Sequence, residues 1–287
     1  MDLASQPENH DAYPKEAARV LSEAHGLDVS RFDGTFLAKS LEKRRAAVSM
    51  ESPREYLGLL AADPAEARLL FQSLRIGHSD FFREPLAMAL LETAILPMLV
   101  KDADNSQEIR VWSAGCAEGQ EPWSVAILLE ELSAACGNPF PYRVIATDIY
   151  PEALEKARRG VYDESAVRNL RLRHLDRYFV RQGQSFSVVP ALRGHVDFSE
   201  YDLLDAHAAG PPAGIFGDFD LVLCCNLLFY YQPGIQKTIL DRVRRSLRTG
   251  GYLVTGATER GIVEKAGGFR GVAAPAPVYQ KVMRMRA

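Results

Sequence analysis

The sequence lacks an excess of basic residues, long apolar runs and a recognisable leader. Its 287 residues include 34 Lys and Arg against 37 Asp and Glu, a formal net charge of −3. A chain that binds nucleic acid through its overall charge is basic, so we expect no nucleic-acid partner. No apolar run approaches the roughly 20 residues that cross a bilayer, so we expect a protein that is not membrane-inserted. The opening segment MDLASQPENHDAYPKEAAR has no basic region followed by an apolar core, which favours a cytoplasmic location.

Cysteine is also scarce. The four cysteines are Cys116, Cys136, Cys224 and Cys225. They have neither the paired spacing of zinc ligands nor the density of a disulfide framework, so we expect no metal site and a reducing compartment. Apolar residues, by contrast, make up 47% of the chain, which is enough for a sizeable core.

Two patterns divide the chain. In its first quarter, apolar residues recur every three or four positions, which predicts an all-helical N-terminal domain over residues 1–85. The pairs Ser52-Pro53 and Asp63-Pro64 are typical of helix starts. From residue 86 to 287, short β-like runs alternate with helical stretches, as in RVWSA followed by EPWSVAILLEELSAA. This alternation predicts a Rossmann-like α/β domain with ligands bound beyond the carboxyl ends of parallel strands. Within it, RYFVRQ and SFSVVP predict a small antiparallel β-subdomain at 168–198.

The sharpest local motif is VWSAGCAEGQEPWS, in which a strand runs through Gly115 and Gly119 into a helix. Glycine lets the backbone turn tightly and approach a ligand. The G-x-G-x-x-G pattern that cradles a pyrophosphate is absent. Asp148 ends the next predicted strand, where a carboxylate can bind both hydroxyls of a ribose or can cap the following helix. Together these residues favour an adenosine ligand without a pyrophosphate, of which S-adenosylmethionine is the common one. Glu121 could bind the amino group of that ligand or complement the helix dipole.

Several phrases, in order along nearly the whole chain, resemble the CheR-type chemotaxis receptor glutamate methyltransferases. HSDFFREPLAM resembles the T-x-FFR segment of that family, and VWSAGCAEGQEPWSVAILL resembles its W-S-A-G-C-S-x-G-E-E-P-Y-S signature. The phrases VIATDIYPEALEKARRGVY, VDFSEYDLL and FDLVLCCNLLFYYQPGIQKTILDRVRRSLRTGGYLVTGATE are similar to its remaining blocks.

The resemblance implies a set of site residues. Those expected to line the S-adenosylmethionine pocket are Ser79, Arg83, Glu121, Asp148, Leu203 and Asn226. Gly115 of the glycine turn and Asp202 are expected there as well, from their own chemistry. Arg83 and Tyr230 are expected to be catalytic, Arg83 by pairing with a carboxylate and Tyr230 by directing the acceptor toward the methyl group.

The chain departs from the family pattern at three positions. Cys225 stands where the family has arginine, Asp202 where it has asparagine, and Gly77 where asparagine is frequent. Asp202 could still accept a hydrogen bond from the adenine amino group, or it could be a polar turn residue. The turn RQGQSFS is short and lacks an extended Gly-rich loop, so we expect receptor docking without a C-terminal peptide tether.

The implied function is transfer of a methyl group from S-adenosylmethionine to glutamate side chains of a methyl-accepting chemoreceptor, which yields glutamate methyl esters and S-adenosylhomocysteine. A glutamate has a pKa of about 4.3, so it is ionised at neutral pH and needs no general base. One alternative is a methyltransferase with another acceptor. Another is a non-catalytic regulatory module that binds S-adenosylmethionine or a receptor, since Cys225 replaces the family arginine. The sequence does not specify an oligomeric state.

Overall fold

The computed structural model describes residues 12–75, 77, 79–103, 107–137, 139–205, 210–211 and 218–282. Its contacts form two compact units, one of Met1–Ile76 with Phe229–Ile235, the other of Gly77–Leu228 with Gln236–Ala287. The domain ranges 1–85 and 86–287 stay predictions. Among the described residues, no helix has both the length and the apolar character needed to cross a membrane.

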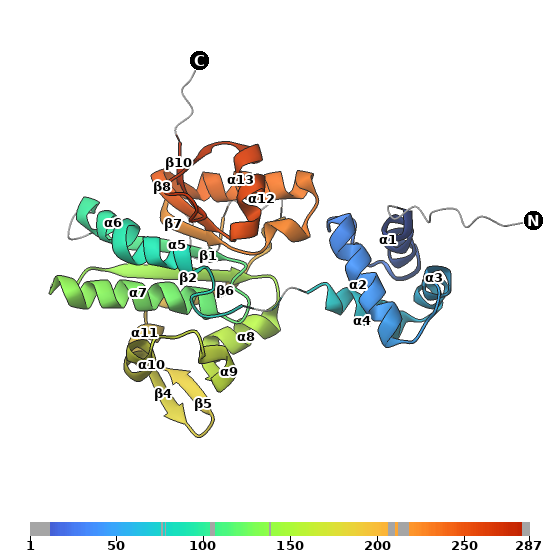
Figure 1. Ribbon diagram of the computed structural model, residues 1–287, viewed down its shortest axis with the longest axis horizontal. Helices are drawn as coiled ribbons and strands as arrows, with labels where there is room; N and C mark the ends of the chain where they lie inside the picture. The colour runs from blue at the N-terminus through green and yellow to red at the C-terminus, as the bar shows by residue number, and fades with distance from the viewer. Residues whose placement is uncertain are drawn as a thin grey trace, which may run out of the picture. The chain divides into compact units, whose positions relative to one another are not determined.

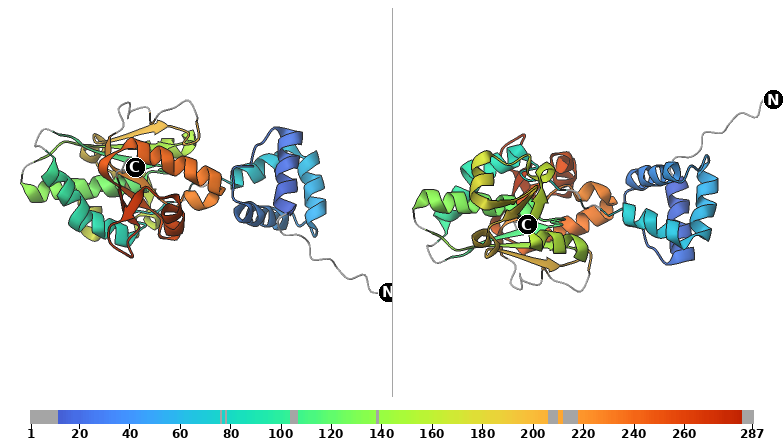
Figure 2. Two further views of the ribbon diagram at one scale, coloured as in Figure 1. Left: turned by 90° about the horizontal axis from the view of Figure 1, so that it is seen from above. Right: turned by 90° about the horizontal axis from the view of Figure 1, so that it is seen from below.

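The first unit is a helical bundle (Figures 1 and 2). Its helices are α1 Ala12–His25, α2 Gly34–Ala47, α3 Pro53–Ala62 and α4 Pro64–Ser73. The predicted helix starts are confirmed: Ser52 forms a capping box with Glu55, and the Asp63 side chain accepts a hydrogen bond from the Ala65 N–H. The apolar face of each helix is buried in one core that includes Leu21, Leu41, Tyr56, Leu60 and Leu70. Helical periodicity in the sequence thus becomes a packed bundle.

The second unit is built on a seven-stranded sheet of order β6-β2-β1-β7-β8-β10-β9. Its strands are β1 Ile109–Ala114, β2 Tyr142–Asp148, β6 Val196–Glu200, β7 Phe219–Cys224, β8 Leu247–Thr255, β9 Phe269–Gly271 and β10 Val278–Lys281. Strands β6, β2, β1, β7 and β8 run parallel, and β10 and β9 add an antiparallel edge. The chain builds outward from β1 to β6 and then returns to β7 on the other side of β1. The sheet therefore reverses its strand order between β1 and β7, where open α/β sheets bind ligands.

Helices flank this sheet (Figure 1). They are α5 Pro85–Leu90, the π-helix η1 Leu91–Ile95, α6 Leu96–Asp102, α7 Gln120–Cys136, α8 Pro151–Arg159, α12 Pro233–Ser246 and α13 Arg260–Ala266, with short 3₁₀ turns at Leu228–Tyr230 and Ala257–Glu259. Every residue of β7 is buried, as is usual for a central parallel strand covered on both faces. The predicted Rossmann-like α/β fold is confirmed.

A separate three-stranded antiparallel sheet of order β3-β5-β4 follows α8. It comprises β3 Val161–Asp163, β4 Phe179–Gln182 and β5 Ser185–Val188, with the short helices α9 Glu164–Val167, α10 Leu172–Tyr178 and α11 Pro190–Arg193. The expected small antiparallel subdomain is thus present, and it also includes β3, which precedes the range predicted from the sequence.

Candidate functional site

The turn after β1 is shaped by glycine. Gly115 and Gly119 have φ values of 77° and 92°, in the left-handed region that glycine adopts readily. The Gly115 and Cys116 N–H groups donate to the Thr147 carbonyl at 2.8 and 2.9 Å. A Cβ at Gly119 would lie 2.8 Å from the Cβ of Ala157 in α8, so no larger residue fits there. The turn is therefore held against β2 and α8, directly before the first turn of α7.

Asp148 connects this turn to the end of β2. The residue is only 6% exposed. Its Oδ2 accepts from the Ala117 N–H at 2.9 Å, and its Oδ1 accepts from the Tyr150 N–H at 3.0 Å. Burial raises the pKa of Asp148, while the backbone N–H donors act in the opposite direction. The N-cap of α8 is Tyr150, and its own side chain makes no capping hydrogen bond. The ribose role of Asp148 stays a prediction. Each carboxylate oxygen keeps a lone pair for a further donor.

Glu121 lies in the first turn of α7 and is partly buried. Its Oε1 accepts from the Ser113 hydroxyl at 2.7 Å. Burial raises the pKa of Glu121 to about 7, opposed by side-chain hydrogen bonds with Cys225 and Ser113 and by the nearby charge of Arg83. The cysteine that stands in place of the family arginine is therefore a direct neighbour of this carboxylate. Glu121 can receive a cationic group, and its ionisation is poised near neutral pH.

The loop after β7 is held by a carboxylate that sequence reasoning missed. Glu259 is fully buried. Its Oε1 accepts from the Leu227 and Leu228 N–H groups at 2.7 and 2.6 Å, and its Oε2 accepts from those of Asn226 and Gly256 at 2.9 and 2.7 Å. The only sequence signal is the acidic residue in TGATE, after the last parallel strand. Because these donors come from the backbone, Glu259 fixes the loop conformation, including the positive φ of 56° at Asn226.

The loops after β1 and β7 meet at the switch point of the sheet. A Cβ at Gly115 would lie 3.3 Å from the Leu227 side chain. The Asn226 Nδ2 donates to Glu84 Oε1 at 3.2 Å, and Glu84 Oε2 accepts from the Ala257 N–H at 3.3 Å. Gly115, Asn226 and the segment that carries Arg83 and Glu84 therefore belong to one contiguous site.

Two buried acceptors near this site lack a hydrogen-bond partner among the described residues. They are Asn226 Oδ1 and Gln120 Oε1, the second on the first residue of α7. Leaving a buried acceptor unpaired is costly, so each of these atoms can accept a hydrogen bond from a bound ligand or an ordered water. S-adenosylmethionine carries hydrogen-bond donors in its amino groups and ribose hydroxyls. The residues present thus fit this cofactor, and Gln120 was not identified from the sequence.

Arg83 follows two aromatic residues that lock its segment to the α/β unit. Phe81 is fully buried. The Phe82 N–H donates to the Ser124 hydroxyl of α7 at 3.0 Å, and the Phe82 ring stacks on His174 of α10 with centroids 5.3 Å apart. Arg83 lines a pocket of about 370 Å³ between α5 and the residues before α10. Its charge also reaches Glu121, so Arg83 lies close to the predicted cofactor site.

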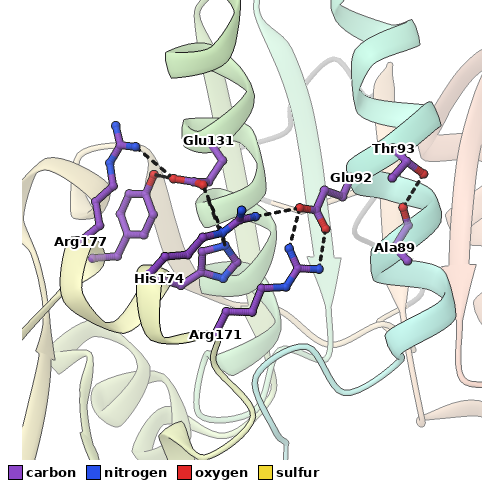
Figure 3. Close-up of polar contacts among 9 residues, drawn as sticks. Ala89, Glu92, Thr93, Glu131, Arg171, His174 and Arg177 are labelled. Atoms are coloured by element: carbon purple, nitrogen blue, oxygen red, sulfur yellow. Dashed lines mark hydrogen bonds and ion pairs between the residues drawn. The ribbon is translucent and has the colours of Figure 1, made fainter.

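Helix α10 is fastened to the α/β core by two carboxylates (Figure 3). Arg171 makes a bidentate contact with Glu92 of η1, at 2.8 and 2.9 Å. Arg177 contacts Glu131 of α7 at 3.2 Å, and His174 Nε2 lies 4.0 Å from the same carboxylate. These contacts keep the His174 ring against Phe82, next to Arg83.

The remaining predicted residues are placed differently. Asp202 Oδ1 accepts from the Leu204 N–H at 2.7 Å, the hydrogen bond of a polar turn residue, which was one of its two expected roles. Leu203 is buried. The Tyr201 N–H donates to the Asp148 carbonyl at 3.0 Å. Asp202 and Leu203 come directly after Tyr201 in the chain, so this bond holds their segment beside the end of β2. Ser79 is partly buried. Tyr230 belongs to the helical unit, and the described residues contain no cluster of metal-ligating side chains.

Comparison with known proteins identifies the family of the chain. Residues 77–275 match the family model of the CheR methyltransferase, SAM binding domain. The chain is 36% identical over 195 residues to chemotaxis protein methyltransferase 1 of Pseudomonas aeruginosa, covering 67% of this chain and 69% of that one. It is 33% identical over 245 residues to chemotaxis protein methyltransferase Cher2 of Pseudomonas putida, covering 83% and 86%.

A third relative is much longer than this chain. An uncharacterized 104.1 kDa protein of Rhodobacter capsulatus is 32% identical over 221 residues, which make up 77% of this chain but only 22% of that protein. The family model nevertheless covers more than half of the chain, and the two Pseudomonas relatives are matched over more than two thirds of their length. The chain therefore belongs to the CheR methyltransferase family and is an S-adenosylmethionine-dependent methyltransferase.

Proposed function

We propose that this methyltransferase esterifies glutamate side chains of a methyl-accepting chemoreceptor-type protein in the cytoplasm. The observation that carries the proposal is the junction of three strand ends, where Asp148, the Gly115 turn and the Asn226 loop come together around unpartnered acceptors. The relatives named as chemotaxis protein methyltransferases support the choice of acceptor.

In this proposal the residues divide between the two substrates. Asp148 accepts the ribose hydroxyls, and Glu121 accepts the ammonium group of the cofactor. The other residues proposed to line the cofactor pocket are Ser79, Arg83, Gly115, Asp202, Leu203 and Asn226. Arg83 and Tyr230 act on the reacting groups, Arg83 as a cation for a carboxylate and Tyr230 as a hydrogen-bond donor to the acceptor.

The reaction needs positioning more than acid-base chemistry. S-adenosylmethionine supplies a methyl group on a positively charged sulfur. The glutamate oxygen forms a bond to the methyl carbon as the carbon–sulfur bond breaks. The electron pair of the broken bond stays on sulfur, which loses its positive charge. No proton moves, because glutamate is already ionised at neutral pH. The protein holds the carboxylate in line and keeps water from solvating it, and positioning of this kind contributes several kcal/mol, on the order of 7 in favourable cases. A lysine acceptor would arrive as an ammonium and would require a base.

The test uses methyl-labelled S-adenosylmethionine and a purified receptor signalling fragment. We expect label on the receptor that mild alkali releases as methanol, because esters hydrolyse and N-methyl groups do not. A matched receptor fragment whose acceptor glutamates are replaced by alanine serves as the control and should stay unlabelled. Alkali-stable label would assign the enzyme to another acceptor. Binding of S-adenosylhomocysteine without any transfer would identify a regulatory module.

A further inference from the structure

The chain segment that carries Tyr230 is hydrogen-bonded to the residues directly before α2. The Asp33 N–H donates to the Tyr230 carbonyl at 2.8 Å, and the Gln232 N–H donates to the Arg31 carbonyl at 3.0 Å. Between these bonds, Phe32 and Tyr231 form an isolated antiparallel bridge. The backbone from the Tyr230 carbonyl to Gln232 is thereby held by main-chain hydrogen bonds to residues 31–33.

Aromatic packing reinforces these hydrogen bonds. Tyr231 stacks on Phe32, with ring centroids 5.6 Å apart and planes at 11°. Phe32 is 4% exposed and is part of the core of the helical unit, so Tyr231 is the anchor of the segment. The Tyr230 ring instead meets the Phe36 ring edge-on, with centroids 4.8 Å apart and planes at 70°. Edge-on pairs of this kind have a preferred geometry, so Phe36 restricts the orientation of Tyr230.

Phe36 is itself rigidly placed. It lies in the first turn of α2, where Asp33 Oδ1 accepts from the Thr35 and Phe36 N–H groups at 2.9 and 3.1 Å. The next residue, Leu37, is 3% exposed and is packed in the core. A capped helix start with a buried neighbour leaves the Phe36 backbone little freedom.

We infer that Phe36 is a positioning residue for Tyr230, so that loss of the Phe36 ring lowers turnover. The inference rests on the proposed role of Tyr230 toward the acceptor. A phenol that directs a nucleophile must be held in a narrow range of orientations, and a small displacement of such a group lowers the rate strongly. Phe36 is then required for the orientation of Tyr230 and has no part in cofactor binding.

The experiment compares full-length variants in the labelled-methyl assay. Phe36→Leu removes the edge contact, and Phe36→Tyr keeps an aromatic ring there. Phe71→Leu is the matched control, because Phe71 in α4 is also partly buried and packs on the same core. We expect Phe36→Leu to lower kcat about 10-fold. S-adenosylhomocysteine affinity should stay within about 2-fold of the parent, while Phe36→Tyr and Phe71→Leu keep most of the turnover.

Combination with Tyr230→Phe separates positioning from loss of stability. If Phe36 acts through Tyr230, Phe36→Leu should have almost no further effect on kcat in the Tyr230→Phe background. Independent, multiplicative effects would overturn the inference, as would equal losses in Phe36→Leu and Phe71→Leu. An unmutated chain that esterifies no receptor would instead refute the proposed function, so the two failures are distinguishable.

Discussion

The pKa of Glu121 predicts that cofactor binding depends on pH near neutrality. Burial raises this pKa to about 7. In the role proposed for Glu121, the ammonium of the ligand pairs with the ionised carboxylate. A group with that pKa is ionised in roughly one molecule in ten at about pH 6 and in nine in ten at about pH 8. We therefore expect S-adenosylhomocysteine affinity to rise about 10-fold between these values. Isothermal titration calorimetry at constant ionic strength measures the dissociation constant of S-adenosylhomocysteine at each pH.

Two variants assign that dependence to Glu121. Glu121→Gln should bind more weakly at about pH 8 and should lose the dependence on pH, because its side chain does not titrate. Cys225→Arg restores the family residue beside Glu121. The added cation favours the ionised carboxylate, so it should move the transition to lower pH. A flat affinity profile in the unmutated protein, or an unchanged profile in Glu121→Gln, would refute the reasoning.

The contribution of Glu121 to stability falls as the pH rises, whereas the ligand affinity is expected to rise. Its folded-state pKa of about 7 lies above the ordinary value of 4.5, so the folded protein without ligand binds the proton more tightly than the unfolded chain. The contribution of Glu121 to stability is therefore largest at low pH and is lost as the pH rises from about 4.5 to 7. Glu121→Gln should remove this contribution to the pH dependence of the free energy of unfolding, measured with urea between about pH 4.5 and 7.

Three further predictions concern other residues. Asp148→Ala should weaken S-adenosylhomocysteine binding about 10- to 100-fold by calorimetry, through loss of charge-assisted hydrogen bonds; unchanged affinity in a folded variant would remove the ribose role. Tyr230→Phe should lower kcat about 10-fold with S-adenosylhomocysteine affinity intact, and unaltered turnover would show that the ring only packs. Glu259→Gln leaves the backbone donors of one carboxylate oxygen unpaired and should cost about 2 to 4 kcal/mol of stability in urea unfolding; a loss below about 1 kcal/mol would contradict its role in holding the Asn226 loop.

The sequence by itself determined features that depend on near neighbours in the chain. Ser52 and Asp63 start helices through side-chain bonds to the next residues, and the glycines after β1 permit a turn that other residues rarely adopt. Asp148 could be located because the carboxyl ends of parallel strands meet at one edge of a sheet. The alternation of strands and helices predicted the fold, because consecutive parallel strands must be joined by crossover helices.

The tertiary structure decided the contacts that join distant segments. Glu259 looks like an ordinary helix-start acid in the sequence, yet the fold buries it beneath the backbone of Asn226 and two further residues. The contact of Cys225 with Glu121, and that of Phe36 with Tyr230, likewise join segments far apart in the chain. Local propensity carries no information about such pairs, because burial and the choice of partner arise only when the elements within each unit are packed.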